Sequence, residues 1–308
     1  MKIKSTIILL FMTLFLCPVL YAENNAATSF KGEVKAVVQD QITKPTPGAL
    51  VKAAKENDLK LVKSLIYKNP AGVNEKDEDG NTALMIAAKN GYFDLIHVLD
   101  DKVGKWLRVN EANNDNYTAL CLAVINNDLR TVGYLIGMKA DVNYECGTRK
   151  ANKGSPLLKA VEENADTLLI DVLVKSKANV NYKDPLGITP LMRAAHSGNI
   201  PVMDILIGAG ADINAKVQCD PCYGGSNKKS SMAVVIWAIR SHKVSAVKYL
   251  IEDKGANPPV SYCEDGAYIT PLDIAVLDGG GPEMVEYVKS IKGCTECNER
   301  GYHLTWWD

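Results

Sequence analysis

Cysteine is the residue type whose spacing in this sequence most clearly suggests chemistry. Four of the eight cysteines form two C-x-x-C pairs, Cys219 with Cys222 and Cys294 with Cys297, and Cys263 lies between the pairs. Such residues can form disulfides in an oxidising compartment, or they can supply four thiolates to a structural zinc ion. The pairs begin 75 positions apart, wider than a compact zinc module, so disulfides are the preferred interpretation and zinc the alternative.

Other catalytic signatures are missing from the sequence. The four histidines are scattered without ligand spacing, and neither G-x-S-x-G nor H-E-x-x-H occurs. Nothing singles out a catalytic carboxylate pair, so we expect neither an enzyme nor a cofactor. The formal net charge of -1, without a long Lys/Arg block, also gives no reason to expect nucleic-acid binding.

Residues 1–22 differ in kind from the rest of the chain. Lys2 and Lys4 precede the apolar run 7–16, and the segment closes on Ala22. This pattern predicts a secretory signal cleaved after Ala22; an uncleaved anchor is the alternative, although about ten apolar residues are short for a span. We expect an exported bacterial protein, periplasmic or secreted. Lipid attachment at Cys17 is not expected, because two bulky residues precede it.

Two further segments flank the central region. Residues 23–47 are polar and end with prolines at alternate positions, which predicts a flexible linker. Residues 293–308 form a tail with the second cysteine pair and Trp306-Trp307. The tryptophans could cover the end of the folded region or serve as a docking point.

Two short patterns recur between residues 48 and 292, and they predict repeated helical hairpins. In the most regular copy, Thr189 can cap a first helix, Pro190 can occupy its first position and Gly198 can end it. Helix openings of Ser/Thr, Pro/Ala and Leu begin at Thr82, Thr118, Ser155, Thr189 and Thr270. The asparagines of Val/Ile-Asn endings follow one another at spacings of 36, 33, 38 and 33 residues: Asn74, Asn110, Asn143, Asn181 and Asn214. A single hairpin cannot bury its apolar face, so an array is expected.

These openings and this period resemble the ankyrin repeat family, whose T-P-L-H-x-A signature recurs about every 33 residues. The resemblance implies an all-α repeat solenoid of about seven helix–turn–helix units with β-hairpin finger loops. The expected units are 48–76, 77–112, 113–147, 152–183, 184–219, 231–260 and 268–292. The histidine of the signature is replaced in these units, by Met85, Cys121, Leu158, Met192, Ile236 and Asp273.

The array places the cysteines in different environments. Cys219, Cys222, Cys263, Cys294 and Cys297 fall in or after enlarged fingers, so they come to one edge of the stack as disulfide candidates. Their connectivity stays open: either each C-x-x-C pair closes on itself, or Cys263 bridges to a neighbouring finger. Cys121 is expected to be a small buried apolar residue, and Cys146 is expected to be a free thiol.

The resemblance further implies that a protein partner binds at the finger tips and the exposed ends of the first helices. By repeat position, this selects Glu78, Asn81, Tyr117, Ile125, Asn126, Glu162, Glu163, Ile188, His196, Trp237 and Arg240. Tyr117, Ile188 and Trp237 are expected to be exposed anchors. The alternative for each is packing between fingers.

The main functional hypothesis is therefore a non-catalytic protein-binding module, exported and monomeric, without a membrane span once the signal is removed. One alternative is a zinc or disulfide-redox protein that uses the C-x-x-C edge, with Cys219, Cys222, Cys294 and Cys297 as zinc ligands. Another is a toxin-neutralising or host-directed binder. The identity of the partner is not encoded in any motif of the sequence.

Overall fold

The computed structural model describes residues 46, 48–148, 153–218, 231–258, 262–264, 267–277 and 279–291. The described residues from 48 to 291 belong to one compact unit. In the described part of this unit, helices dominate and strands are limited to two short hairpins. The prediction of an all-α repeat solenoid is confirmed.

The helices come in consecutive pairs, each with an inner and an outer member. The inner helices are α3 (Ala49–Lys55), α5 (Ala83–Asn90), α7 (Ala119–Ile125), α9 (Pro156–Glu162), α11 (Pro190–Ser197), α13 (Val234–Arg240) and α15 (Pro271–Leu277). The outer helices are α4 (Leu59–Lys68), α6 (Phe93–Val103), α8 (Leu129–Gly137), α10 (Thr167–Lys175), α12 (Ile200–Gly208), α14 (Val244–Lys248) and α16 (Gly281–Ser290). Short turns η1 (Pro70–Asn74) and η2 (Gly104–Trp106) follow α4 and α6, and a π-helical turn, η4 (Tyr249–Asp253), extends α14.

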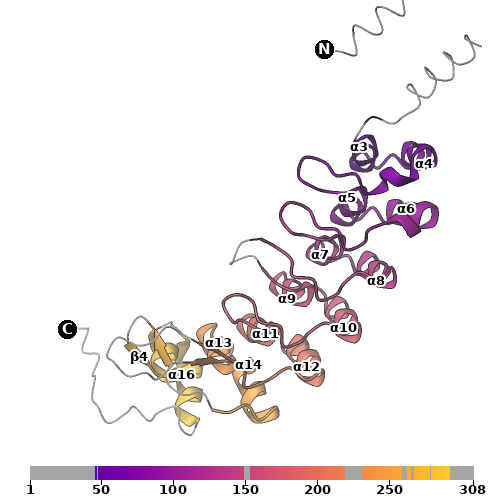
Figure 1. The fold of residues 1–308 in the computed structure, drawn as a ribbon. Helices are drawn as coiled ribbons and strands as arrows, with labels where there is room; N and C mark the ends of the chain where they lie inside the picture. Colours follow the sequence, from indigo (N-terminus) through magenta and orange to yellow (C-terminus); the bar gives the residue numbers. More distant parts are fainter. Residues whose placement is uncertain are drawn as a thin grey trace, which may run out of the picture. The chain divides into compact units, whose positions relative to one another are not determined.

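Inner helices pack on inner helices, and outer helices pack on outer helices, so the pairs form two parallel rows (Figure 1). Fingers connect one pair to the next on the side of the inner row. Two of these fingers contain antiparallel hairpins, β1 (Lys216–Gln218) with β2 (Ser231–Ala233), and β3 (Tyr262–Glu264) with β4 (Ala267–Ile269).

Side-chain caps explain why the inner helices begin where they do. The hydroxyl of Thr189 accepts the N–H of Met192 at 3.3 Å, and the same bond occurs at Thr82, Thr118 and Ser155. Gly198 then ends α11 with a φ of 74°. At the corresponding turn after α7, Asn127 adopts the left-handed conformation with a φ of 52°. Asparagine tolerates that region better than most residues do, and the predicted caps and turns are confirmed.

The core lies between the two rows. Alanines such as Ala87, Ala123 and Ala194 are fully buried on the inner helices, and their small side chains let neighbouring helices approach closely. Larger side chains, including Leu95 and Leu135, fill the space beneath the outer helices. Each pair therefore completes its core only against its neighbours.

The asparagines of the repeated endings join consecutive pairs. Asn143 Oδ1 accepts the N–H of Asn179 at 2.7 Å, and its Nδ2 donates to the carbonyl of Lys177 at 3.2 Å. We name the set the asparagine ladder; it comprises Asn74, Asn110, Asn143, Asn181 and Asn214, each of which accepts a backbone N–H from the following pair. No helix among the described residues is long and apolar enough to cross a membrane.

Candidate protein-binding face

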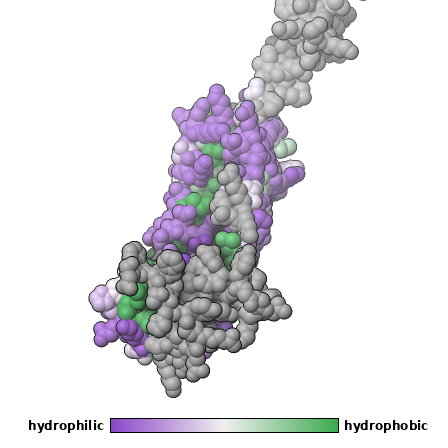
Figure 2. Space-filling model, turned by 90° about the vertical axis from the view of Figure 1, so that its left-hand side faces the viewer, coloured by the Kyte–Doolittle hydropathy of each residue, from purple (hydrophilic) through white to green (hydrophobic). Residues whose placement is uncertain are grey.

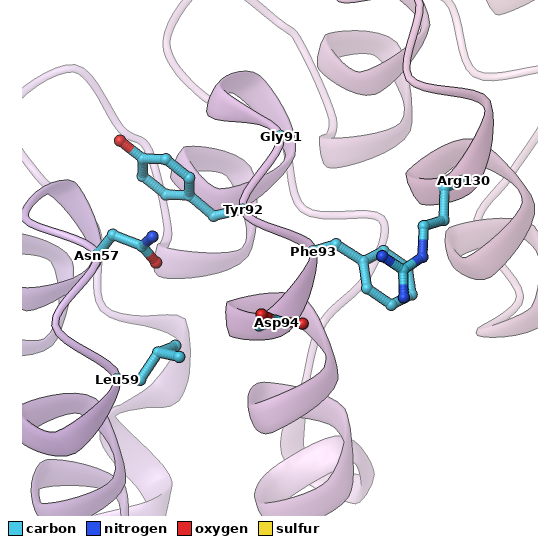
Figure 3. Close-up of a pocket in the computed structure, with 7 residues that line it drawn as sticks. All are labelled: Asn57, Leu59, Gly91, Tyr92, Phe93, Asp94 and Arg130. Carbon is cyan, nitrogen blue, oxygen red and sulfur yellow. The ribbon is translucent and has the colours of Figure 1, made fainter.

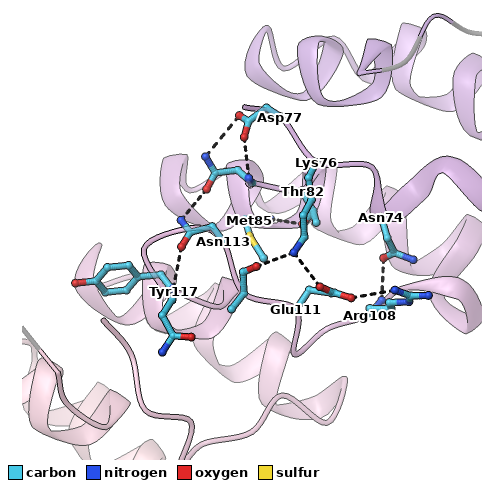
Figure 4. A network of polar contacts seen from close by, with 12 residues as sticks. Asn74, Lys76, Asp77, Thr82, Met85, Arg108, Glu111, Asn113 and Tyr117 are labelled. Atoms are coloured by element: carbon cyan, nitrogen blue, oxygen red, sulfur yellow. Dashed lines mark hydrogen bonds and ion pairs between the residues drawn. The ribbon is translucent and has the colours of Figure 1, made fainter. Parts of the chain in front are cut away.

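The first two fingers are held together by side chains at their turns (Figure 4). Asp77 Oδ1 accepts the N–H of Asn81 at 2.7 Å, and Asn113 Oδ1 accepts the N–H of Tyr117 at 2.8 Å. Asn113 Nδ2 then donates to Asn81 Oδ1 at 2.8 Å, which connects the two turns. These bonds replace water contacts of the loop backbone, so the fingers present a preorganised edge.

Two of the predicted partner-facing residues prove to be structural. Asn81 is only 9% exposed because it bridges neighbouring fingers, and Ile188 is only 5% exposed because it belongs to the core. Ile188 directly precedes the helix cap Thr189, a position where an apolar side chain packs back on the helix. The predictions of Asn81 as a contact residue and of Ile188 as an exposed anchor are therefore wrong.

Other predicted residues on this face are accessible. Glu78 is exposed, and the ring of Tyr117 extends away from the finger network (Figure 4). Ile125 and Asn126 are exposed where α7 ends, and Glu163 is exposed where α9 ends. Whether these residues contact a partner stays a prediction.

A disulfide fixes the third finger. Cys121 on α7 is bonded to Cys146 in the finger of the same unit, with their Cα atoms 6.2 Å apart, and both residues are fully buried. The predictions of Cys121 as an unbonded apolar residue and of Cys146 as a free thiol are wrong. The disulfide attaches the finger to α7, and Cys146 exchanges two backbone hydrogen bonds with Gly154, which join the two arms of the finger.

The disulfide also positions the neighbouring residue, Glu145. Its carboxylate pairs with Lys153 at 3.0 Å and accepts the hydroxyl of Tyr182 at 2.9 Å. The bonds from Lys153 and Tyr182 lower the pKa of the Glu145 carboxyl. Glu145 therefore connects the third finger to the fourth.

Charged side chains connect the inner helices α9 and α11. Glu162 accepts Lys159 Nζ at 2.9 Å and lies 3.2 Å from Nε of Arg193. Lys159 is nearly inaccessible, which requires such a partner for its charge. Glu162 is thus held between two cations, and its predicted contact with a partner stays a prediction.

His196 and Trp237 come together from α11 and α13. Their ring centroids lie 6.1 Å apart in an edge-to-face arrangement, and the hydroxyl of Ser241 contacts His196 Nδ1. The same hydroxyl lies 3.0 Å from the carbonyl of Trp237. Because one hydroxyl carries a single proton, donation to that carbonyl leaves Nδ1–H of His196 to donate to Ser241, and Nε2 is then an open acceptor.

The environment of His196 favours the neutral form of its imidazole. Partial desolvation of its ring, followed by the positive charges of Arg193, Arg240 and Lys243, lowers the pKa of the imidazole from its ordinary value of 6.5. Trp237 adds an unused donor, since its indole Nε1 is buried and has no hydrogen-bond partner among the described residues. This part of the face therefore offers an aromatic surface, polar atoms and positive charge.

We name this cluster the α11–α13 site; it comprises Arg193, His196, Trp237, Arg240 and Ser241. Sequence reasoning selected His196, Trp237 and Arg240, which the structure brings together, but missed Arg193 and Ser241. The available signal was helical spacing, because Arg193 precedes His196 by three positions and Ser241 follows Trp237 by four. Glu78 and Tyr117 belong instead to the separate group around the first fingers.

Figure 2 shows the side with the fingers and the inner row. Its surface is mostly hydrophilic, with smaller hydrophobic areas between hydrophilic ones. A recess of about 250 Å³ lies elsewhere, at the turns between inner and outer helices (Figure 3). Phe93 and Arg130 line it, with the guanidinium carbon 3.6 Å from the ring centroid, and so do Asn57, Leu59, Gly91, Tyr92 and Asp94.

The cysteine-edge predictions cannot be placed in the same way. Cys219, Cys222, Cys294 and Cys297 lie outside the described residues, and only the backbone of Cys263 is described, in β3. Among the described residues, no cluster of His, Cys, Asp and Glu could hold a metal ion.

Comparison with known proteins gives several relatives. The chain is 29% identical over 139 residues to a putative ankyrin repeat protein of fowlpox virus, covering 45% of this chain and 39% of the viral protein. It is 25% identical over 151 residues to a putative ankyrin repeat protein of Escherichia coli, covering 49% and 71%. A cation channel homologue of Caenorhabditis elegans matches at 27% identity over 56% of this chain but only 14% of its own length.

A solved structure is also similar. It is a chain in the complex of the predatory endopeptidase Bd0816 of Bdellovibrio bacteriovorus with the immunity protein Bd3460. The two chains share 27% identity with a TM-score of 0.54, and the match covers 68% of this chain and 99% of that chain.

The family model described as "Ankyrin repeats (3 copies)" matches residues 50–146 and 142–217, which is more than half of the sequence. The paired helices, capped inner row and fingers agree with that match. The chain belongs to the ankyrin repeat family.

Proposed function

We propose that this chain is an exported, non-catalytic module that binds a protein partner through the α11–α13 site and the neighbouring fingers. Ankyrin repeats generally mediate protein–protein interaction. The single observation that carries the proposal is the pairing of His196 with Trp237, whose buried indole N–H lacks an acceptor among the described residues.

The chemistry of this site favours an acidic or carbonyl-rich segment of the partner. An unsatisfied buried donor costs about 1–3 kcal/mol, and a turn of the Trp237 ring that exposes Nε1 to an acceptor of the partner would recover much of it. The cations Arg193, Arg240 and Lys243 around His196 favour a carboxylate, which would share Arg193 with its present contact Glu162. Tryptophan and arginine are also the residues that most often dominate interface energetics.

Export is proposed from the sequence of residues 1–22, and the buried Cys121–Cys146 disulfide supports it. Structural disulfides persist in oxidising compartments and are rare in the cytosol. The test is to follow a tagged chain in its host: a shortened chain in the periplasm or medium, with the disulfide formed, is expected. Retention of the full-length chain in the cytosol would refute export.

Binding can be tested by crosslinking a photoreactive residue placed at Ser197, the exposed neighbour of His196, in living cells, followed by identification of the crosslinked protein. Direct affinity for that protein is then measured for the parent, His196→Ala and Trp237→Phe, the last of which removes the indole donor but keeps an aromatic ring. We expect each change to weaken binding about tenfold or more. A matched control is Leu168→Ser, which changes an exposed residue of the outer helix α10.

A second candidate function is neutralisation of a degradative enzyme, favoured by the solved structure of an endopeptidase with an immunity protein. The partner would then be an exported peptidase, and binding would block its activity. The purified chain should inhibit such an enzyme in stoichiometric amounts, and Trp237→Phe should lose most of the inhibition. Tight binding without inhibition would support a protein-binding module but exclude neutralisation of the enzyme.

A further inference from the structure

A second surface lies on the outer row, away from the fingers. It contains Lys60, Lys63, Tyr67 and Lys68 on α4, together with Lys105 and Trp106 in η2. We name these six residues the lysine–aromatic surface. The two elements belong to adjacent units, because α4 packs on α6 and the turns η1 and η2 pack on one another (Figure 1).

The aromatic members are unusually accessible. Tyr67 is 89% exposed and Trp106 is 51% exposed, although both have large apolar rings. Leu61, on the same helix, is exposed as well. Packing within the array does not account for these side chains, since an inner helix covers only the opposite side of α4 and buries Val62 and Ile66 there.

The lysines of the surface carry positive charge without an ion-pair partner among the described residues. All four are exposed. Two acids adjoin the surface: Asp58 caps α4 and accepts the backbone N–H of Lys60 at 3.0 Å, and Asp101 pairs with Lys102 at 2.6 Å. Lys102, and more weakly Lys63, lower the pKa of the Asp101 carboxyl. Lys105 lies 5.5 Å from the centroid of the Trp106 ring.

This charge is a local feature of the outer row. The outer helix α8 has one basic residue, Arg130, which stacks on Phe93. The single lysine of α10, Lys175, is paired with Asp171, and α12 has no basic residue. The chain as a whole has a formal net charge of -1, so the positive surface results from arrangement rather than composition.

We propose that the lysine–aromatic surface binds the anionic face of a lipid bilayer. Tyr, Trp and Lys together are the side chains that favour membrane–water interfaces. The lysine ammonium is attracted to an anionic surface as a point charge and needs no fixed hydrogen-bond geometry. Arginine, in contrast, is favoured where a carboxylate is bound through both of its oxygens. Tyr67 is 89% exposed on its helix, so its ring stands out from the surface, which suits insertion into a lipid headgroup layer.

Such binding would orient the array. Contact through the outer row leaves the fingers and the inner row facing away from the bilayer, so the chain could bind lipid and a protein partner at once. The lysine–aromatic surface shares no residue with the α11–α13 site. Failure of the lipid-binding proposal would therefore leave the proposal of a protein partner unaffected, and the reverse also holds.

The test is co-sedimentation of the chain without residues 1–22 with vesicles of phosphatidylglycerol and phosphatidylethanolamine, compared with phosphatidylcholine alone. Each lysine near an anionic surface contributes about fivefold in affinity. The triple variant Lys60→Gln, Lys63→Gln, Lys68→Gln should therefore weaken binding on the order of 100-fold. The control Lys89→Gln, Lys183→Gln, Lys216→Gln removes the same charge elsewhere and should retain binding.

The aromatic contribution needs its own variant. Tyr67→Ser with Trp106→Ser should weaken binding even near ~1 M salt, where the Debye length falls to about 3 Å and charge attraction is largely screened. Thermal unfolding of every variant should match the parent, since the changed side chains are exposed. Absence of binding to anionic vesicles, or equal losses in both triple variants, would overturn the proposal. Retention on immobilised polyglutamate without vesicle binding would also overturn it, in favour of an acidic protein.

Discussion

Breaking the bond between Cys121 and Cys146 should destabilise the third unit by an amount that follows from the chain between them. The two cysteines are 25 residues apart. Cross-linking a loop of that length lowers the entropy of the unfolded chain and so raises the free energy of unfolding by about 3.5 kcal/mol at 25 °C. Reduction of the bond keeps both sulfur atoms in place. Replacement of Cys121 by Ala would add about 1 kcal/mol for lost packing, because the residue is fully buried.

The assay is urea unfolding of the parent and of a Cys121→Ala, Cys146→Ala variant, each with and without dithiothreitol. We expect reductant to lower the stability of the parent by about 2–4 kcal/mol. It should affect the double variant much less, which separates this bond from the other cysteines. Hydrogen exchange should show the largest loss of protection near Cys146 and Gly154, whose backbone bonds hold the finger.

The result that would refute this reasoning is equal sensitivity of both proteins to the reductant. That outcome would mean that the cross-link contributes little, or that other cysteines account for the effect. A parent insensitive to reductant, with Cys146 open to alkylation, would show that the two thiols do not bond in solution.

Three further predictions concern individual residues. Asn143→Ala should cost about 1–2 kcal/mol, because two hydrogen bonds to the next unit are lost; urea unfolding measures this, and Asn126→Ala, at an exposed turn, should be near neutral. Gly198→Ala should cost about 1 kcal/mol or more, since its φ is 74° and a Cβ would lie 2.8 Å from Lys243 Cγ. Gly208→Ala, in open space at the end of a helix, should be neutral or slightly stabilising, and equal losses in the two glycine variants would contradict the conformational argument. The pKa of the His196 imidazole, measured by NMR, should lie below its ordinary value of 6.5. Because the folded state binds this proton less well than the unfolded state, the free energy of unfolding should decrease as the pH falls through 6.5. His196→Gln should remove that dependence.

The repeated local signals made the fold predictable. Thr189 and Gly198 mark the two ends of α11, and both act through contacts within a few residues. The repeated Val/Ile-Asn endings also predicted the period of the array. Their role as hydrogen-bond bridges did not follow from the pattern, because it depends on the approach of the next unit.

The binding face was only partly predictable because position in a repeat does not determine exposure. Ile188 and Tyr117 each precede the threonine cap of an inner helix, yet Ile188 is buried while Tyr117 remains partly exposed. The Cys121–Cys146 bond escaped prediction for a related reason. The partner of Cys146 lies within its own unit, 25 residues earlier, on a helix whose cysteine has the buried position of an ordinary apolar residue.

The asparagine ladder has a consequence for how this sequence can diverge. Each asparagine of the ladder forms hydrogen bonds with the main chain of the next unit. The N–H groups and carbonyls of that main chain are present whatever side chains the unit carries. Substitutions on the surface therefore leave the register between units intact. A stack built in this way can drift to identities of 24–29% with its relatives, as seen here, and still preserve the spacing on which its surfaces depend.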